Sequence, residues 1–220
     1  MRAFQLALLG IAVTAMAGVS APALAGNLLA NGNFENTGFG GTTGYYNIGP
    51  GGDHAVPSDF GWTVSDGNVD IVANNASYGP ILTGGGNYVL DLVGYGSTGE
   101  ISQSVDTVLN QTYDVTFDYS SNNGINGPTA SVNGNDLIGT VTGTHSWQVF
   151  TGSFVGTGSP TTFSISEIYG ANNAGVFLDN VSVAAAPEPA AWAMLLLGVG
   201  GVGAAVRMSK RRERAVLATA

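Results

Sequence analysis

Carboxylates are the charged side chains that could do chemistry in the central part of this sequence, where no Lys or Arg accompanies them. Residues 26–186 contain 13 Asp and Glu and no Lys or Arg, and the six basic residues all lie outside that stretch. A segment without cationic side chains cannot neutralise phosphates, which excludes nucleic acid as a partner. It also has no lysine for a P-loop or a Schiff base.

Glutamates could supply a paired-carboxylate catalytic site. Glu35, Glu100 and Glu167 are the three glutamates of residues 26–186, beside ten aspartates. A retaining or inverting glycosidase needs two carboxyl groups at a set separation, which the sequence does not define. A secreted glycan-active enzyme, a hydrolase or a lyase, therefore stays open as an alternative function.

Other catalytic and metal-binding patterns are weak or missing. The chain has no cysteine, and its two histidines, His54 and His145, have no partner at metal-ligand spacing. No G-x-S-x-G motif occurs, and the two histidines give a Ser-His-Asp triad little support. Residues 94–99 match G-x-G-x-x-G, but a strand pattern follows them instead of the helix that binds a phosphate. That pattern indicates a hairpin.

Tyrosines in glycine-rich segments are the candidate ligand-binding residues. Tyr45, Tyr46 and Tyr95 lie in such contexts, as does Tyr169. A flat ring can stack on the C–H face of a sugar, which makes these three tyrosines candidate glycan platforms. The alternative is that each ring folds over the edge of the protein, and we favour this for Tyr169.

Short strands must position these side chains. Residues 26–186 are rich in Gly, Asn, Ser and Thr and show no 3.6-residue apolar period. Residues 113–119 alternate strictly, which is typical of a strand with one solvated face. Ten strands with frequent turn signals predict an all-β fold, a single β-sandwich domain over residues 26–186. The strands are predicted at 62–64, 69–72, 88–92, 100–105, 112–119, 129–132, 138–141, 147–154, 161–168 and 176–183. Residues 36–57 are predicted to be a surface loop.

The N-terminus indicates export. Arg2 precedes an uncharged apolar run, and Ala23 and Ala25 form an A-x-A cleavage signature after Pro22. These features predict a signal peptide, residues 1–25, that is removed after Ala25.

The C-terminus contains a second hydrophobic segment. Residues 190–206 carry no charge, and five basic residues follow at 207–214. Seventeen helical residues span about 25 Å, close to the hydrocarbon thickness of a bilayer. The positive-inside rule keeps the basic tail in the cytoplasm and the β-domain outside. We therefore predict a transmembrane helix over 190–206, with a short tail at 215–220.

The residues before that helix define a motif. Pro187, Glu188 and Pro189 precede the apolar run and the basic cluster, and residues 187–214 resemble a PEP-CTERM sorting signal. (The same segment is also labelled as the C-terminal domain of ice-binding proteins, a label that implies no ice binding.) The resemblance implies that an exosortase, a membrane-bound processing enzyme, recognises the motif and removes the helix. A plain tail anchor is the alternative.

The β-domain itself has recognisable opening and closing motifs. Residues 27–35 (NLLANGNFE) begin the mature chain and residues 178–183 (LDNVSV) end the domain, with 60–62, 88–92 and 112–117 between them. Their order resembles the choice-of-anchor C family and its relatives among eukaryotic cell-wall proteins. It is more distantly similar to galactose-binding-like carbohydrate-binding modules. The resemblance implies a jelly-roll sandwich and a role in an extracellular matrix or with glycans.

Two carboxylates suggest a structural calcium ion. Asp179 shares a strand face with Phe177, Val181 and Val183, so it is predicted to point inward, where it needs a partner. Without a base, a hard cation held by carboxylate and carbonyl oxygens would serve. Similar jelly-roll modules hold calcium where the first and last strands meet, which implies Ca²⁺ bound by Glu35 and Asp179. Backbone amides are the alternative partners of Asp179.

These features together predict an exported, non-catalytic protein of the cell surface or extracellular matrix. Its expected partners are an exosortase-type enzyme, the inner membrane before processing and an exopolysaccharide. Before processing it is anchored in the inner membrane with its domain outside, and afterwards it is in the envelope, at the surface or in the matrix. A purely structural or adhesive protein is a further alternative.

Overall fold

A computed structural model describes residues 25–187 except 42, 76 and 172, together with residues 197, 198, 200, 201 and 207. Residues 25–186 form one compact unit. Ala23, Glu188 and Pro189 lie outside the described residues, as does most of the predicted helix at 190–206. Residues 197, 198, 200, 201 and 207 are helical. Within the described part of the chain, no helix has both the length and the apolar character needed to span a bilayer.

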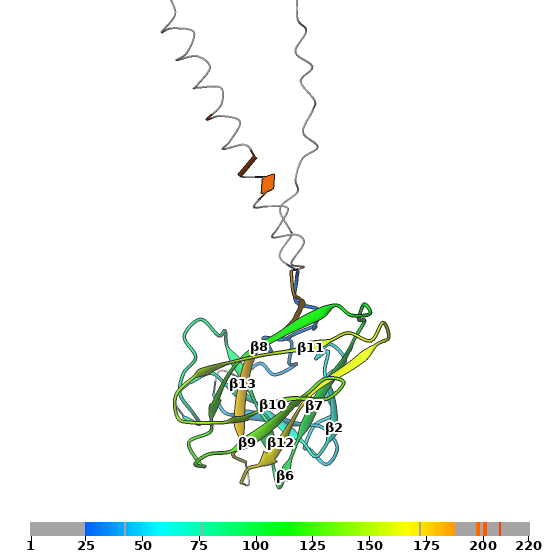
Figure 1. Cartoon of the computed structure of the whole chain (residues 1–220). Helices are drawn as coiled ribbons and strands as arrows, with labels where there is room; N and C mark the ends of the chain where they lie inside the picture. Colours follow the sequence, from blue (N-terminus) through cyan, green and yellow to red (C-terminus); the bar gives the residue numbers. More distant parts are fainter. Residues whose placement is uncertain are drawn as a thin grey trace, which may run out of the picture. The chain divides into compact units, whose positions relative to one another are not determined.

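The compact unit is a β-sandwich, as predicted (Figure 1). One sheet has six strands in the order β1-β3-β4-β13-β8-β11, and the other has five in the order β10-β9-β12-β7-β2. A two-stranded hairpin, β5-β6, lies at residues 93–98 and confirms the hairpin predicted for the glycine-rich motif. The strands are β1 (Tyr45–Ile48), β2 (Thr63–Asp66), β3 (Val69–Ala73), β4 (Tyr88–Asp91), β5 (Val93–Gly94), β6 (Ser97–Thr98), β7 (Glu100–Val105), β8 (Thr112–Ser121), β9 (Thr129–Asn133), β10 (Leu137–Thr142), β11 (Gln148–Val155), β12 (Thr161–Tyr169) and β13 (Val176–Ala185).

All ten predicted strands are present, with ends within two residues of those predicted. The prediction of a loop over 36–57 is wrong in one place, because β1 pairs antiparallel with β3 from Tyr45 to Ile48. Glycines and asparagines flank these four residues, and the sequence pattern of so short a strand is masked by its neighbours.

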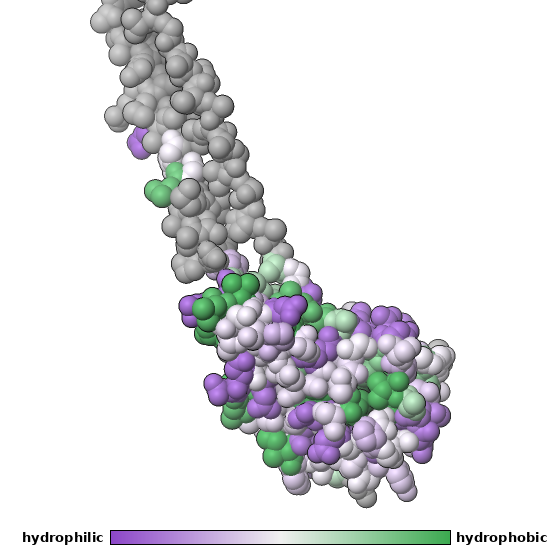
Figure 2. Space-filling model, turned by 90° about the vertical axis from the view of Figure 1, so that its right-hand side faces the viewer, coloured by the Kyte–Doolittle hydropathy of each residue, from purple (hydrophilic) through white to green (hydrophobic). Residues whose placement is uncertain are grey.

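The main core lies between the two sheets. It includes Tyr113, Val115 and Phe117 from the inner face of β8, which alternate with exposed Thr112, Asp114 and Thr116 as predicted. The large side chains that are completely buried are Phe34, Phe60, Phe117, Phe163, Phe177, Ile48, Ile71, Leu90, Leu92, Ile101, Ile165 and Leu178. On the outside, most of the face in Figure 2 is hydrophilic or neutral, with separate hydrophobic groups.

The opening and closing motifs meet in the structure. The amide of Leu28 donates to the carbonyl of Val183 and the amide of Val181 donates to the carbonyl of Gly32, both at 2.8 Å. The side-chain amide of Asn27 donates to the carbonyl of Val181 at 2.8 Å. The first residues of the domain are therefore fastened along β13, its last strand.

A bulge in β13 corrects the predicted orientation of Asp179. The pairing with β8 shifts between Asp179 and Ser182, and Asn180 has a φ of 51°. Alternation therefore changes phase: Val181 and Val183 pack in the main core, whereas Phe177 packs with Val72 and Val89 in a second cluster. Asp179, two residues from Phe177, lies on the outer face with it. The prediction that the Asp179 side chain is buried is nevertheless confirmed, at 0% exposed.

Candidate functional site

The outer face of the six-stranded sheet is covered by the segment between β3 and β4, residues 74–87. Gly79 packs so closely on the Phe177 ring that it has no room for a Cβ, and Gly85 lies against Asp179. The indole Nε1 of Trp147 donates to the carbonyl of Pro80 at 2.7 Å, and the amide of Asn123 donates to Tyr78. Phe177 and Asp179 are buried because this segment lies over them.

An aromatic pair stands at one side of this cover. Tyr45, on the edge strand β1, is 43% exposed, and its ring meets that of Tyr78 edge-on, with centroids 5.9 Å apart and an interplanar angle of 90°. Tyr78 comes from residues 74–87 and is half-buried. The two perpendicular rings form a corner with Tyr45 open to solvent. Sequence reasoning missed Tyr78, because only the fold brings its loop onto β1.

The other two candidate tyrosines occupy different settings. Tyr46 is half-buried, and its ring stacks with Phe39 at 5.6 Å and with His54 at 4.1 Å, so it serves packing. Tyr95, in the turn between β5 and β6, is 70% exposed. In the β1–β3 ladder, Tyr45 pairs with Val72 and Ile48 with Val69, whereas Tyr95 contacts Asn68 next to Val69. Tyr45 and Tyr95 therefore lie toward opposite ends of β1.

Glu35 and Asp179 approach the same loop. Glu35 Oε1 accepts hydrogen bonds from the amides of Asn87 and Tyr88 at 2.8 and 3.0 Å, and its carboxylate fills the space that a Cβ at Gly86 would need. Asp179 Oδ2 lies 2.6 Å from the position of a Cβ at Gly85. The two candidate metal ligands therefore lie beside consecutive glycines of this loop.

The unbonded oxygen of Asp179 is the observation that bears on calcium. Asp179 Oδ1 accepts from the amide of Asn180 at 2.6 Å, but Oδ2 is buried without a hydrogen-bond partner. Burial raises the pKa of Asp179 to about 8, and the charges of Asp118 and Glu35 add to the effect. Among the residues the structure describes, no three His, Cys, Asp or Glu side chains are grouped to hold a metal by themselves. Glu35 and Asp179 fit a calcium ion only if backbone oxygens complete its coordination.

A second group of buried acids was not predicted. Asp70 and Asp91 are paired directly across β3 and β4 and are 3% and 0% exposed. Glu167, from β12 in the other sheet, is 8% exposed. Burial raises the pKa of Asp70 to about 6 and those of Asp91 and Glu167 to about 8. The charge of Asp70 further raises the pKa of Asp91, and the charge of Asp91 further raises that of Glu167. The sequence feature that could have indicated this group is the absence of any Lys or Arg in residues 26–186 to neutralise a buried acid.

Amide groups hold these acids in place. Asn47 Nδ2 donates to Asp70 at 2.5 Å, and Asn122 Nδ2 donates to Asp91 Oδ2 at 2.9 Å. The amide of Val176 donates to Glu167 Oε2 at 3.0 Å, while Glu167 Oε1 is buried without a partner. These are structural contacts inside the domain, not an open reaction site.

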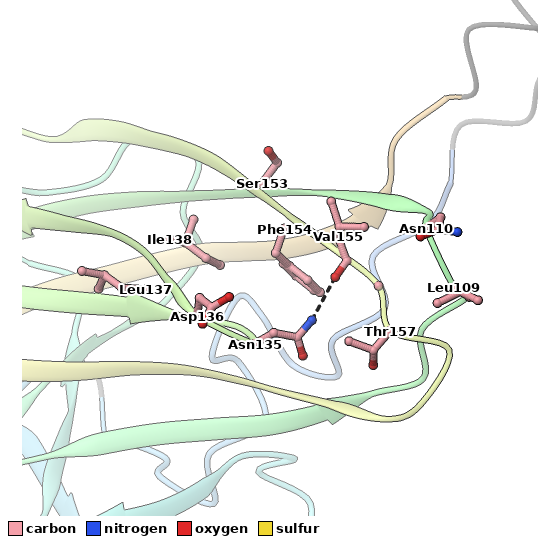
Figure 3. Close-up of a pocket in the computed structure, with 11 residues that line it drawn as sticks. Leu109, Asn110, Asn135, Asp136, Leu137, Ile138, Ser153, Phe154, Val155 and Thr157 are labelled. Atoms are coloured by element: carbon pink, nitrogen blue, oxygen red, sulfur yellow. Dashed lines mark hydrogen bonds between the residues drawn. The ribbon is translucent and has the colours of Figure 1, made fainter.

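The glutamates do not form a catalytic pair in an open cleft. Glu35 is held by Asn87 and Tyr88 as described, and Glu100 accepts hydrogen bonds from the hydroxyls of Ser65 and Ser166. A pocket of 540 Å³ lies elsewhere, between the turn at 133–137, the end of β11 and residues 109–110 (Figure 3). Asp136 is the one acid among its lining residues, and Leu109, Leu137, Ile138, Phe154 and Val155 make much of its wall apolar.

The histidines take no part in either acid group. His54 is exposed and stacks on Tyr46. His145 is exposed, and its Nε2 lies 3.1 Å from the carbonyl oxygen of Ile125. Trp62 is 3% exposed in the main core, whereas Trp147 is only partly buried, beside Phe177.

The fold and the sequence motifs define a β-sandwich protein that carries a C-terminal sorting signal. Residues 185–212 match the PEP-CTERM protein-sorting motif, which marks an exported protein. Residues 27–184 match the family described as a protein of unknown function (DUF642), and the chain belongs to that family. No curated protein matches the sequence.

Solved structures with a similar fold include carbohydrate-binding modules. The CBM22-1 xylan-binding domain of Paenibacillus barcinonensis Xyn10C is 18% identical in sequence and has a TM-score of 0.48. The match covers 76% of this chain and 99% of the xylan-binding domain. TmCBM61, solved in complex with β-1,4-galactotriose, is 16% identical, with 73% and 99% covered and a TM-score of 0.45. A putative sugar-binding protein of Bacteroides thetaiotaomicron is 11% identical, with 73% and 100% covered and a TM-score of 0.41.

Proposed function

We propose that this protein is a non-catalytic component of the cell surface or extracellular matrix that binds polysaccharide through Tyr45 and Tyr78. The observation that carries the proposal is the perpendicular pair of rings, with Tyr45 43% exposed on an edge strand. A sugar ring can stack on one aromatic face while the second ring limits its orientation. Tyr95, 70% exposed, is a separate and weaker candidate, because no aromatic ring among the described residues contacts its ring.

A glycan array with the purified full chain tests this function. We expect binding to at least one polysaccharide, and Tyr45→Ala should weaken it about tenfold, the loss typical of an aromatic anchor. Tyr169→Ala is the matched control, since Tyr169 is 58% exposed on β12 in the other sheet. Equal losses in the two variants, or no binding by the wild type, would favour the structural or adhesive alternative.

The same domain is proposed to hold a structural Ca²⁺ at Glu35 and Asp179. The support is the buried, unbonded Oδ2 of Asp179 beside Gly85 and the placement of Glu35 at the next residue of that loop. A bound cation would neutralise this buried carboxylate, because residues 26–186 contain no Lys or Arg that could do so. Such an ion would also fasten residues 74–87, and with them Tyr78, onto the sheet.

The enzyme alternative has less support. A glycosidase or lyase needs two carboxyl groups facing a substrate cleft, and the three glutamates instead make the internal contacts described above. Turnover of a polysaccharide that is lost on Glu100→Gln or Glu167→Gln would overturn the non-catalytic proposal.

The sorting signal defines the proposed path of the protein. A signal peptide cut after Ala25 starts export, and an exosortase-type enzyme is proposed to act at Pro187, Glu188 and Pro189. The chain would be anchored in the inner membrane before that step and would then pass to the envelope, the surface or the matrix.

A further inference from the structure

Strand β11 is an edge strand with little of the usual protection: among the described residues, only the carbonyl of Val155 has a partner on the open edge, Asn135 of the β9–β10 turn. It is last in the order of the six-stranded sheet, and all eight of its residues pair in unbroken register with β8. Gln148–Val155 contains no charged residue and no proline. Natural proteins blunt such edges with charges, prolines, bulges or very short strands, because an open edge can pair with another chain.

The other three sheet edges are protected. β1 and β2 have four residues each, and the pairing of β10 with β9 shifts register between Leu137 and Gly139. β11 alone combines length, regularity and neutrality. Figure 1 shows it beside β8 at the margin of its sheet.

The direction of the open backbone groups follows from two neighbouring contacts. The carbonyl of Val155 accepts a hydrogen bond from Asn135 Nδ2 at 2.9 Å, on the side away from β8 (Figure 3). The amide and carbonyl of Gly156, the next residue, bond to Gln111 and Asn110 on the β8 side. Backbone direction alternates along a strand, so Val149, Thr151 and Ser153 also point away from β8. Among the described residues, the N–H and C=O groups of these three have no partner across that edge.

The sequence of this edge is nearly palindromic. Val149-Phe150-Thr151-Gly152-Ser153-Phe154-Val155 reads almost identically in both directions about Gly152. When two copies of such a strand pair antiparallel about a two-fold axis, each residue meets its equivalent from the other end. The arrangement therefore joins valine to valine, phenylalanine to phenylalanine and Thr151 to Ser153.

We propose that a second copy of this chain pairs with β11 through this edge, about a two-fold axis at Gly152. The outward-pointing residues are Val149, Thr151, Ser153 and Val155, and antiparallel pairing about Gly152 makes them the hydrogen-bonded pairs. Val149 and Val155 are 66% and 55% exposed on the outer face of the sheet, and in the dimer they cover each other.

Gly152 and the pocket lie where the second strand would approach. Gly152 falls in the closer, non-hydrogen-bonded pair, and the space that its Cβ would need is filled by Ile138 and Phe150 of its own chain. The 540 Å³ pocket borders the C-terminal half of the edge at Ser153, Phe154 and Val155, and residues 135–138 line its other side. In the dimer, Val155 exchanges Asn135 for the amide of Val149 in the second copy. The pair joins two six-stranded sheets into one continuous sheet.

Charge sets the conditions for pairing. Each copy carries 13 acidic residues and no Lys or Arg in residues 26–186, so two copies repel each other electrostatically. Salt screens this repulsion. β11 itself is neutral. Association is therefore expected to strengthen as ionic strength rises, the reverse of an interface held by ion pairs.

Sedimentation of the full chain in a mild detergent tests the dimer. We expect a concentration-dependent dimer, and Val149→Lys should weaken it about tenfold or more, because lysine on an edge strand opposes pairing. Val108→Lys is the matched control, since Val108 is 67% exposed outside any strand. A wild type that stays monomeric at all concentrations and salt levels, or equal effects of the two lysines, would overturn the proposal.

Cysteine cross-linking gives an independent readout of the register, because the chain has no native cysteine. The double variant Thr151→Cys and Ser153→Cys should form a covalent dimer on mild oxidation, since the proposed register places residue 151 opposite residue 153. Thr140→Cys with Thr142→Cys, two exposed positions with the same spacing on β10, is the control. Cross-linking at equal rates in both variants would contradict pairing through β11.

Discussion

The carboxyl groups of Asp91 and Glu167 converge on Gly175 from different sheets. Asp91 Oδ1 and Glu167 Oε2 lie 2.9 and 3.0 Å from the position that a Cβ of residue 175 would occupy. Burial raises the pKa of each to about 8. Glycine is therefore required at 175 for space, and the pair has no base with which to share its charge.

This arrangement predicts a domain that is more stable in mild acid than in mild base. Folding raises the pKa values of Asp91 and Glu167 from 3.8 and 4.5 to about 8, so the folded state binds protons more tightly than the unfolded chain. The stabilisation is complete below about pH 4 and is lost as the pH rises through the folded values. We expect the Tm, measured with chelator, to fall by at least about 5 °C between pH 5 and pH 9, at about 2–4 °C per kcal/mol.

Glu167→Gln identifies the groups responsible for this pH dependence. Glutamine preserves the shape of the side chain and removes its titration, so the fall in Tm between pH 5 and pH 9 should become smaller. Asp106→Asn, an exposed aspartate, should leave the fall unchanged. A Tm that rises from pH 5 to pH 9 in the wild type would refute the explanation.

Calcium should stabilise the domain through Asp179. A ligand present at a hundred times its Kd stabilises the folded state by about 2.7 kcal/mol, which corresponds to roughly 5–10 °C in Tm for a domain of this size. Asp179→Asn should abolish the response. Without calcium this variant should melt no lower than the wild type, because it removes a buried carboxylate whose Oδ2 has no partner. Asp66→Asn, on the other sheet, serves as the control, and identical wild-type midpoints with calcium and with chelator would contradict the site.

The strands could be predicted because apolar residues alternate along them, as in β8, where Tyr113, Val115 and Phe117 are all buried. The orientation of Asp179 could not, since it depends on a bulge at Asn180 that shifts the alternation by one residue. The different settings of Tyr45 and Tyr46 could not be predicted either. Adjacent residues of a strand point to opposite faces, but residues 45–48 were predicted to be part of a loop.

The buried acids were beyond sequence reasoning for a related reason. Asp91 is a polar residue at the end of a short strand, a position that is usually solvated. It is buried because Asn122 and Gly175 come from segments that are distant in sequence and lie against it. Tertiary contacts of this kind leave no periodic signal.

Gly32→Ala should destabilise the domain at the junction of its first and last segments. A Cβ at residue 32 would overlap the carbonyl oxygen of Val181, whose amide is bonded to Gly32. Overpacking of this kind typically costs about 1–3 kcal/mol in the free energy of unfolding. Urea denaturation measures it, and Gly40→Ala is the control because nothing lies within 4 Å of a Cβ there. Equal midpoints for the two variants would show that the opening motif is not tightly fastened to β13.

Glu188→Ala should block processing of the C-terminus in the native host. The five basic residues after the apolar run resist passage through the membrane, since each costs about 2.5–3.5 kcal/mol at the centre of a bilayer. Pro187 and Pro189 disfavour helix in the residues before them, so the motif should be accessible outside the membrane as an extended segment. Glu188 is the one charge between the prolines and would be read by the enzyme. Mass spectrometry should find wild-type protein ending near 187–189, Glu188→Ala extending through the apolar run, and the control Glu213→Ala processed normally. Mature wild-type protein that still ends at Ala220 would instead identify the segment as a permanent anchor.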